Sequence, residues 1–131
     1  MTKFTKVLVC GGRGYSNYNK VEEVLTDLQN SIGRSIFVIT GGATGADSLA
    51  EKFAKNYGLP CAIVPAIWTV YGRSAGPIRN EWMLTLNPEW VVAFPGGNGT
   101  ANMVQLAKDN KINCIKVDDP THKDDADKIR S

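Results

Sequence analysis

Apolar and polar residues alternate in blocks along the chain, and the blocks predict strands and helices in turn. Short runs that are apolar almost throughout predict strands at residues 4–10, 35–40, 61–66, 89–94 and 112–117. The segments between them carry apolar residues at helical spacing and predict helices at residues 19–32, 46–58, 76–86 and 100–110. In the second helix, for example, Leu49, Phe53 and Tyr57 share one face, and Gly58 ends the pattern.

This alternation predicts an α/β fold, a single Rossmann-like domain with a parallel five-stranded sheet and helices on both faces. Strands that are apolar throughout are typical of a parallel sheet covered on both sides. Right-handed crossovers place every strand-to-helix loop at the same edge of the sheet. We expect the strand order 3-2-1-4-5, which reverses between the first and fourth strands. Open α/β sheets bind ligands at such a reversal.

Three of the predicted strands stop at paired glycines, in the loops 11–18, 41–46 and 96–100. Glycine lets backbone approach a ligand closely, and a helix start offers free N–H groups to a phosphate. One such loop alone is consistent with a tight turn and no ligand. Because three converge on one rim, we expect an anionic, nucleotide-derived ligand there. The loop residues expected to contact it are Gly11, Gly12, Arg13, Gly14, Tyr15, Gly41, Gly42, Thr44, Gly45, Asp47, Gly96, Gly97, Gly99 and Thr100.

Length and charge narrow the class of protein. The 131 residues fit one domain, which we place at residues 1–117, followed by a polar tail at 118–131. The net charge of +2, from 15 basic and 13 acidic residues, does not favour a duplex-DNA binder or a polybasic membrane module. No apolar stretch approaches the roughly 20 residues that span a bilayer, so we expect no membrane partner.

The cysteines and the histidine carry little chemistry. Cys10, Cys61 and Cys114 are odd in number and widely spaced, which argues against disulfides or a zinc site. We expect reduced, mostly buried thiols in a cytoplasmic protein, with no metal and no cofactor. Nothing in the sequence marks Cys10 as a nucleophile. The single histidine, His122, lies in the predicted tail and is expected to be solvated, which excludes a Ser-His-Asp triad.

Two common phosphate-binding motifs are absent. The first loop, "GGRGYSNY", lacks the G-x-G-x-x-G spacing of a dinucleotide fingerprint. The second predicted strand ends at Thr40 without an acid for a ribose. The second loop, "GGATGADS", lacks the lysine of a P-loop. An ordinary dinucleotide or P-loop site is therefore not expected.

Several motifs resemble known families. "PGGNGTANM" at residues 95–103 resembles the P-G-G-x-G-T-x-x-E loop of the Lonely Guy phosphoribohydrolases, and "IRNEWM" resembles their R-K-x-x-M stretch. "GGATGADSLAEKFA" is similar to the glycine loop and helix of the DNA-processing protein A family. Together with "GGRGYSNY" and "YGRSAGPIRNEWM", they resemble the SLOG superfamily of Rossmann-like nucleotide binders, and within it the YspA-type branch, over residues 7–117.

The resemblance implies a phosphate site in which the catalytic half is altered. The glutamate that ends the Lonely Guy loop is replaced by Met103, and the lysine after the family's arginine is replaced by Asn80. Cleavage of a glycosidic bond needs a carboxylate, which a thioether cannot replace. Asp47 and Glu81 are the candidate substitutes. Thr44 and Asp47 also have the spacing of a capping box, and Glu81 also fits a solvated acid in a first helical turn.

Arginines and aromatic residues complete the expected site. The family's arginine corresponds to Arg79, whose fork can hold a phosphate with two hydrogen bonds, and Asn80 follows it. Arg13 and Arg73 lie in loops that can reach the same crevice. Thr100 is expected to cap the last helix and to bind phosphate. Tyr15, Trp68 and Tyr71 are expected either to stack on a base or to pack under a loop.

These features leave three functions open. The leading hypothesis is a module that senses or sequesters a nucleotide. The alternative is an N-glycosidic hydrolase of nucleoside 5′-monophosphates that uses Asp47 or Glu81. A single-stranded nucleic-acid binder is disfavoured by the low net charge. A homodimer or higher homo-oligomer is expected, because the relatives pair through helices and Trp82, Met83 and Trp90 offer apolar area.

Overall fold

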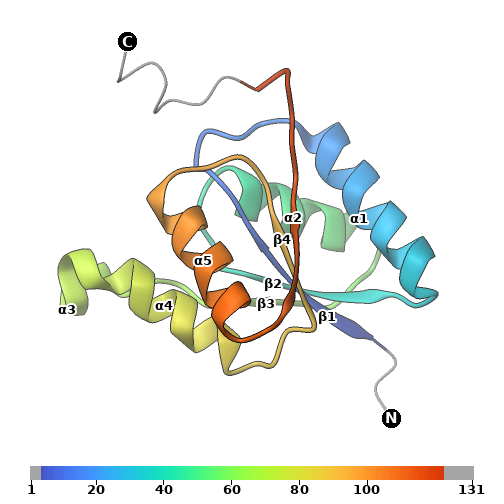
Figure 1. Cartoon of the computed structure of the whole chain (residues 1–131). Helices are drawn as coiled ribbons and strands as arrows, with labels where there is room; N and C mark the ends of the chain where they lie inside the picture. The colour runs from blue at the N-terminus through green and yellow to red at the C-terminus, as the bar shows by residue number, and fades with distance from the viewer. Residues whose placement is uncertain (1–3, 123–131) are drawn as a thin grey trace.

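The computed structural model describes residues 4–122 and contains a five-stranded parallel sheet in the order β3-β2-β1-β4-β5 (Figure 1). The order reverses between β1 and β4, so the predicted topology is confirmed. The strands, in chain order, are β1 (Thr5–Cys10), β2 (Ile36–Thr40), β3 (Cys61–Ile63), β4 (Trp90–Ala93) and β5 (Asn113–Lys116).

Helices cover both faces of the sheet. The four predicted helices are α1 (Tyr18–Ile32), α2 (Ala46–Asn56), α4 (Ala75–Leu84) and α5 (Asn98–Asp109). A short helix α3 (Trp68–Tyr71) and a 3-10 turn (Gly72–Ser74) precede α4 and were not predicted, because a single helical turn shows no periodicity. Figure 1 shows α3 at the outer end of α4, away from the sheet. None of the helices within residues 4–122 has both the length and the apolar character needed to cross a bilayer.

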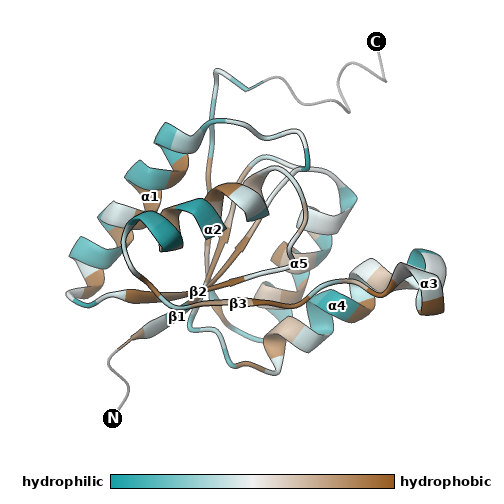
Figure 2. Ribbon diagram, turned by 180° about the vertical axis from the view of Figure 1, so that it is seen from behind, coloured by the Kyte–Doolittle hydropathy of each residue, from teal (hydrophilic) through white to brown (hydrophobic). Residues whose placement is uncertain are grey.

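The strand side chains divide between two cores. Val7 and Val9 of β1 pack with α1 and α2, whereas Leu8 and Cys10 pack on the opposite face with α4 and α5. Apolar strands between helices with hydrophilic outer surfaces are visible in Figure 2. Met83, which we expected at a subunit interface, belongs to the second core and is only 2% exposed. Its place on the sheet-facing side of α4 explains the difference.

The cysteines differ from expectation in one respect. Cys10 is buried, but Cys61 is exposed and Cys114 is half-buried. Both of the latter lie in the edge strands β3 and β5, which have a neighbouring strand on one side only. The prediction of mostly buried thiols is therefore wrong for Cys61, because an apolar run at a sheet edge is not fully covered.

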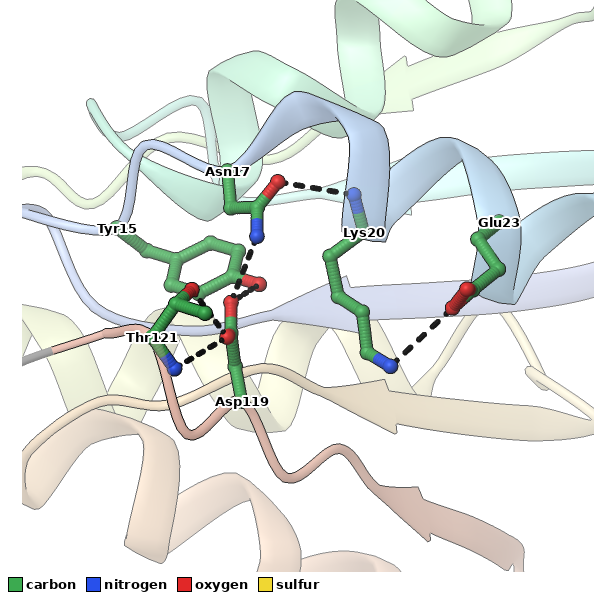
Figure 3. Close-up of polar contacts among 6 residues, drawn as sticks. All are labelled: Tyr15, Asn17, Lys20, Glu23, Asp119 and Thr121. Carbon is green, nitrogen blue, oxygen red and sulfur yellow. Dashed lines mark hydrogen bonds and ion pairs between the residues drawn. The ribbon is translucent and has the colours of Figure 1, made fainter.

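The segment after β5 packs against the start of α1 (Figure 3). Asp119 is buried, and its Oδ2 accepts hydrogen bonds from Tyr15 Oη at 2.7 Å and from Asn17 Nδ2 at 3.0 Å. Its Oδ1 accepts hydrogen bonds from the backbone N–H and the hydroxyl of Thr121. These hydrogen bonds hold the pKa of Asp119 well below its usual range. We call this set of contacts the Asp119 latch.

The latch alters the expected boundary between the domain and its tail. The packing continues past residue 117, because Asp119 joins the body of the domain. The ring of His122 lies 5.1 Å from that of Tyr15, edge to face, and the residue is half-buried, whereas the sequence predicted a fully exposed histidine. Residues 123–131 of the predicted tail lie outside the described residues.

Candidate functional site

A pocket of about 440 Å³ lies at the carboxyl ends of β1 and β4, where the strand order reverses. Its volume falls within the range of about 300 to 1,000 Å³ that is typical of small-molecule sites. It is bordered by the loop after β1, the first turn of α2, the helix α4 and the first turn of α5. The predicted site residues that it brings together are Gly11, Gly12, Arg13, Asp47, Arg73, Arg79, Asn80, Gly97, Gly99 and Thr100.

The first turn of α5 forms one wall of the pocket. The helix begins at Asn98, Gly97 is its N-cap, and no side chain of the described residues caps it. Thr100 therefore lies inside the helix, and the expectation that it is the N-cap is wrong by three residues. The first N–H groups of a helix have no acceptor within the helix and form its positive end. Asn98 and Asn102 also line the pocket, and neither was predicted to do so.

Gly97 and Gly99 face open space. Apart from the adjoining residues and the backbone of its own helix, a Cβ atom at either position would meet no atom within 4 Å, and neither residue has a positive φ. Gly99 lies within the helix, where glycine is less favourable than alanine by about 1 kcal/mol. Packing and backbone geometry thus do not require glycine at these two positions, and both leave the helix terminus accessible from the pocket.

The loop after β2, residues 41–45, is different, because its backbone donors are already engaged. The N–H groups of Gly41 and Ala43 donate to Asp47 Oδ2 at 3.1 and 3.2 Å. The N–H of Gly42 donates to Thr40 Oγ1 at 3.2 Å. The loop therefore has no N–H group at residues 41–43 left to hold a phosphate.

The start of α2 also differs from the predicted capping box. The N-cap is Gly45 and not Thr44, and no side chain caps the helix. The N–H of Ala46 instead donates to the carbonyl oxygen of Gly12 at 3.1 Å. The carboxylate of Asp47 points back into its own loop, as its bonds to Gly41 and Ala43 show. The capping-box interpretation is therefore wrong, because this acid binds loop donors that precede the cap.

Packing between loops explains several of the other glycines. Gly45 has a φ of 79°, and a Cβ there would collide with the carbonyl oxygens of Gly12 and Arg13. A Cβ at Gly96 would collide with Thr100 Oγ1 and the backbone N of Gly12. Gly45 and Gly96 are outside the lining of the pocket, and both bring neighbouring loops together.

Asp47 is a buried acid at the edge of the pocket. It is 6% exposed, and burial raises its pKa to about 6. The N–H groups of Ala43 and Gly41 and the guanidinium of Arg79 act in the opposite direction but do not outweigh burial. Both hydrogen bonds that Asp47 accepts from the described residues go to Oδ2. A group with this pKa exchanges its proton near neutral pH.

Arg79 and Asn80 link the two sides of the pocket. Arg79 donates through Nη1 to the carbonyl oxygen of Gly41 at 3.0 Å and through Nε to Asn80 Oδ1 at 3.2 Å. Asn80 is buried, and its Nδ2 donates to Asn102 Oδ1 at 2.8 Å and to the carbonyl oxygen of Gly99 at 3.3 Å. The amide of Asn80 thus fixes Arg79 relative to the first turn of α5.

The charged groups around the pocket favour an anion. Arg13, Arg73 and Arg79 line it, and Asp47 is the acidic residue among its lining. Together with the positive end of α5, these groups give the pocket a positive field. Within residues 4–122, no group of three or more His, Cys, Asp or Glu side chains is placed to hold a metal ion.

Cys10 also lines the pocket, at the end of β1. Burial raises the pKa of its thiol well above the usual range, and the neighbouring Asp47 raises it further. The thiol is therefore protonated at neutral pH, and a protonated thiol is a poor nucleophile.

Some predicted site residues lie elsewhere. A neighbouring hollow is lined by Gly41, Gly42 and Thr44. Arg13 and Arg79 line both this hollow and the pocket. Gly14 and Glu81 are exposed and do not line the pocket, which removes Glu81 as a candidate for its chemistry.

Tyr15 and Tyr71, which were expected either to stack on a base or to pack under a loop, do not line the pocket. Tyr15 is 2% exposed, and its ring lies 5.4 Å from that of Phe94, so of its two expected roles the structure shows packing under the loop and not contact with a ligand. Its hydroxyl donates a hydrogen bond to Asp119, which helps to hold the ring in the core. Asp119 is 104 positions away, so no local sequence pattern reveals this contact. The ring of Tyr71 instead meets Trp82 edge to face at 5.9 Å. The side chain of Trp68 lies outside the described part of the chain.

Comparison with known proteins gives three similarities. The family model described as "YspA, cpYpsA-related SLOG family" matches residues 5–71. The Gene 61 protein of Mycobacterium phage D29 is 28% identical over 121 residues, which cover 87% of this chain and 97% of that protein. DNA processing protein A from Streptococcus pneumoniae, known from an X-ray structure, superposes with a TM-score of 0.50 at 18% identity over 86% of this chain.

These similarities differ in what they show. The match to DNA processing protein A covers 59% of that chain, so this chain corresponds to less than two thirds of it, and at 18% identity the likeness shows the fold alone. The family match includes β1, β2 and both of the glycine loops that follow them, and it extends over half of the sequence. The chain therefore belongs to the YspA, cpYpsA-related SLOG family.

Proposed function

We propose that this protein binds a nucleotide or a nucleotide-derived molecule in the pocket, with a phosphate at the first turn of α5. The observation that carries the proposal is the pair Gly97 and Gly99, which leave an uncapped helix terminus open where the fold itself does not require glycine. A helix N-terminus with accessible N–H groups is a favourable place for a phosphate.

The electrostatics of the pocket support an anionic ligand. Arg79 donates two of the five N–H bonds of its guanidinium to described residues, so three N–H bonds are available to a ligand. Arg13 and Arg73 line the same pocket. A planar guanidinium beside a helix N-terminus can hold a phosphate from two directions.

The site favours binding over cleavage of a glycosidic bond. In the loop that resembles the Lonely Guy motif, the position of the glutamate is Met103, which is fully buried in the second core. The adjacent Asn102 is hydrogen-bonded to Asn80. Neither side chain supplies a negative charge to an oxocarbenium-like transition state. We therefore infer a sensor or a sequestering module.

Calorimetric titration tests the proposal. The four nucleoside 5′-monophosphates are compared with the corresponding nucleosides, and mass spectrometry identifies what co-purifies with the protein. We expect the phosphate-bearing forms to bind and the nucleosides to bind at least about tenfold more weakly. Equal affinity for the two forms would show that the first turn of α5 does not hold a phosphate.

A hydrolase is the second candidate, and Asp47 favours it. A carboxyl group with a pKa of about 6 at the edge of a pocket has the property of a general acid or base. The test is to incubate the protein with the same monophosphates and measure free base by chromatography. Release of base that is lost in Asp47→Asn would establish the hydrolase, and no release alongside binding would favour the sensor.

We also propose that two copies of the chain pair through α3 and α4. Val70 is 69% exposed, and Tyr71, Trp82 and Leu86 are exposed large apolar residues of the same region. Aromatic residues are enriched at the centres of interfaces. Light scattering should give twice the mass of one chain, and Val70→Asp together with Trp82→Glu should halve it. A monomer in the unmodified protein would contradict pairing.

A further inference from the structure

A second hollow, which we call the outer hollow, lies next to the pocket. Its volume is about 330 Å³, and it shares Arg13, Ala43 and Arg79 with the pocket. Its remaining walls come from the loop after β2 and from Pro65 and Ala66, which follow β3. Each of the two hollows reaches the size of a small-molecule site on its own.

Arg79 lies on the border between the two hollows, since it lines both. Its position is fixed by the hydrogen bonds to Gly41 and Asn80. A guanidinium that is held in place and keeps free N–H bonds is suited to a phosphate group. A phosphate bound at Arg79 would have one substituent on each side, one in the pocket and one in the outer hollow.

Apart from Arg13 and Arg79, which it shares with the pocket, the outer hollow is lined by uncharged residues and has no charged group for a second phosphate. The N–H groups of Gly41, Gly42 and Ala43, which form its wall, are engaged by Asp47 and Thr40. Pro65 and Ala66 present apolar surface on the other side. The apolar surface of Pro65 and Ala66 suits the face of a base, and the hydroxyl of Thr44 and the two arginines offer polar contacts to a ribose.

We propose that the ligand is a dinucleotide, in which phosphate joins two nucleosides, and that Arg79 and not a G-x-G-x-x-G loop holds the linkage. One nucleotide occupies the pocket with a phosphate at the first turn of α5. The phosphate linkage lies along Arg79 and Arg13, and the second nucleoside lies in the outer hollow. This inference rests on the proposed function and extends it, because a mononucleotide would use the pocket alone.

Calorimetry on the full chain tests the inference with three probes for each base. They are the nucleoside 5′-monophosphate, the dinucleotide in which two such nucleosides share a pyrophosphate, and a single strand of about ten nucleotides. We expect the dinucleotide to bind at least about tenfold more tightly than the monophosphate, because one more well-placed contact contributes that factor.

Two variants narrow the outer hollow without touching the pocket. Ala66→Phe and Ala66→Trp each place a ring in it, and Ala66 does not line the pocket. We expect both variants to lose the advantage of the dinucleotide, while their affinity for the monophosphate stays within about twofold of that of the unmodified protein. The monophosphate thus serves as the matched control for folding and for the pocket.

The outcomes separate the two proposals. Equal affinity for monophosphate and dinucleotide, or an advantage that survives both variants, overturns the dinucleotide and leaves a mononucleotide pocket. Tighter binding of the single strand than of the dinucleotide overturns a free dinucleotide in favour of a nucleic-acid strand. If none of the probes binds, the proposed function fails, and the inference fails with it.

Discussion

The loops after β2 and β4 have similar sequences but opposite hydrogen-bonding states. "GGATGAD" at residues 41–47 and "GGNGTAN" at residues 96–102 each begin with paired glycines and run into a helix. In the first, the seventh residue is Asp47, whose carboxylate accepts two N–H groups of its own loop. In the second, the seventh residue is Asn102, whose side chain accepts from Asn80, and the helix terminus is uncapped.

The comparison shows that glycine loops of similar sequence need not have the same role. An internal carboxylate takes the place that an external anion would occupy, so the loop after β2 is closed to phosphate. The glycine at residue 45 is required by a φ of 79° and by contact with Gly12. The glycines at 97 and 99 meet no internal requirement, which is the expected property of residues that leave space for a ligand.

The strongest test of the comparison is Gly45→Ala. The new methyl group would collide with the carbonyl oxygens of Gly12 and Arg13 at a φ that disfavours side chains. We expect the free energy of unfolding to fall by about 3 kcal/mol or more, measured by urea denaturation. Gly99→Ala is the matched control and should be neutral or more stable by up to about 1 kcal/mol. Equal stability of the two variants would contradict the conclusion that folding requires glycine at residue 45 and not at residue 99.

The second test is the pH dependence that Asp47 creates. Because its pKa is raised from 3.8 to about 6, the folded protein binds this proton more tightly than the unfolded chain does. The contribution to stability is largest below pH 4 and decreases as the pH rises through about 6, by at most about 3 kcal/mol.

The control for this test is Asp47→Asn, whose carbonyl oxygen can still accept the two N–H groups. Urea denaturation between pH 4 and pH 7 should show a decrease in the unmodified protein that is smaller in the variant. If the free energy of unfolding instead rises over this range more in the unmodified protein than in Asp47→Asn, the loop favours the ionised acid, and burial does not dominate.

Arg79→Ala should lower the affinity for the nucleotide that binds most tightly by roughly 10- to 150-fold, because a charge-assisted contact contributes about 1.5 to 3 kcal/mol. Calorimetry measures the affinity. Arg34→Ala removes the same charge from an exposed turn and should leave affinity within about twofold. Comparable losses in the two variants would point to net charge and not to the position of Arg79.

Among these variants, Gly99→Ala should change the free energy of binding least, and it should affect binding without lowering stability. Its methyl group would enter the open space at the first turn of α5, and we expect nucleotide affinity to fall by about tenfold while stability is maintained or rises. The variant therefore separates the role of this glycine in binding from its role in folding. Unchanged affinity would place the phosphate away from this helix.

The fold was predictable from the sequence because the signals for it are local. Apolar runs and helical spacing correctly predicted the strands and the four long helices, and the expected strand order is confirmed as well. The helix starts were less predictable, since Thr44 and Thr100 have the composition of caps while Gly45 and Gly97 occupy the cap positions. The start of α3 had no periodic signal at all.

The pocket was predictable in part for a related reason. Topology alone brings Gly12, Arg79 and Gly97 to one edge of the sheet, and the structure places all three at the pocket. Which donors are free depends on contacts between side chains and loops, such as those of Asp47, that spacing does not specify. The burial of Tyr15 depends on Asp119, near the other end of the described chain.

The Asp119 latch has a consequence for how the protein is made. The N–H of Tyr15 donates to the carbonyl oxygen of Gly12 at the edge of the pocket. The hydroxyl of Tyr15 donates to Asp119, which is synthesised 104 residues later. During synthesis, which proceeds at about 5 to 20 residues per second, the first loop lacks that partner for several seconds at least. The wall of the pocket that is translated first is thus among the last to be secured, and a nascent chain released before residue 119 would carry the family's glycine loops without the contact that anchors the first of them.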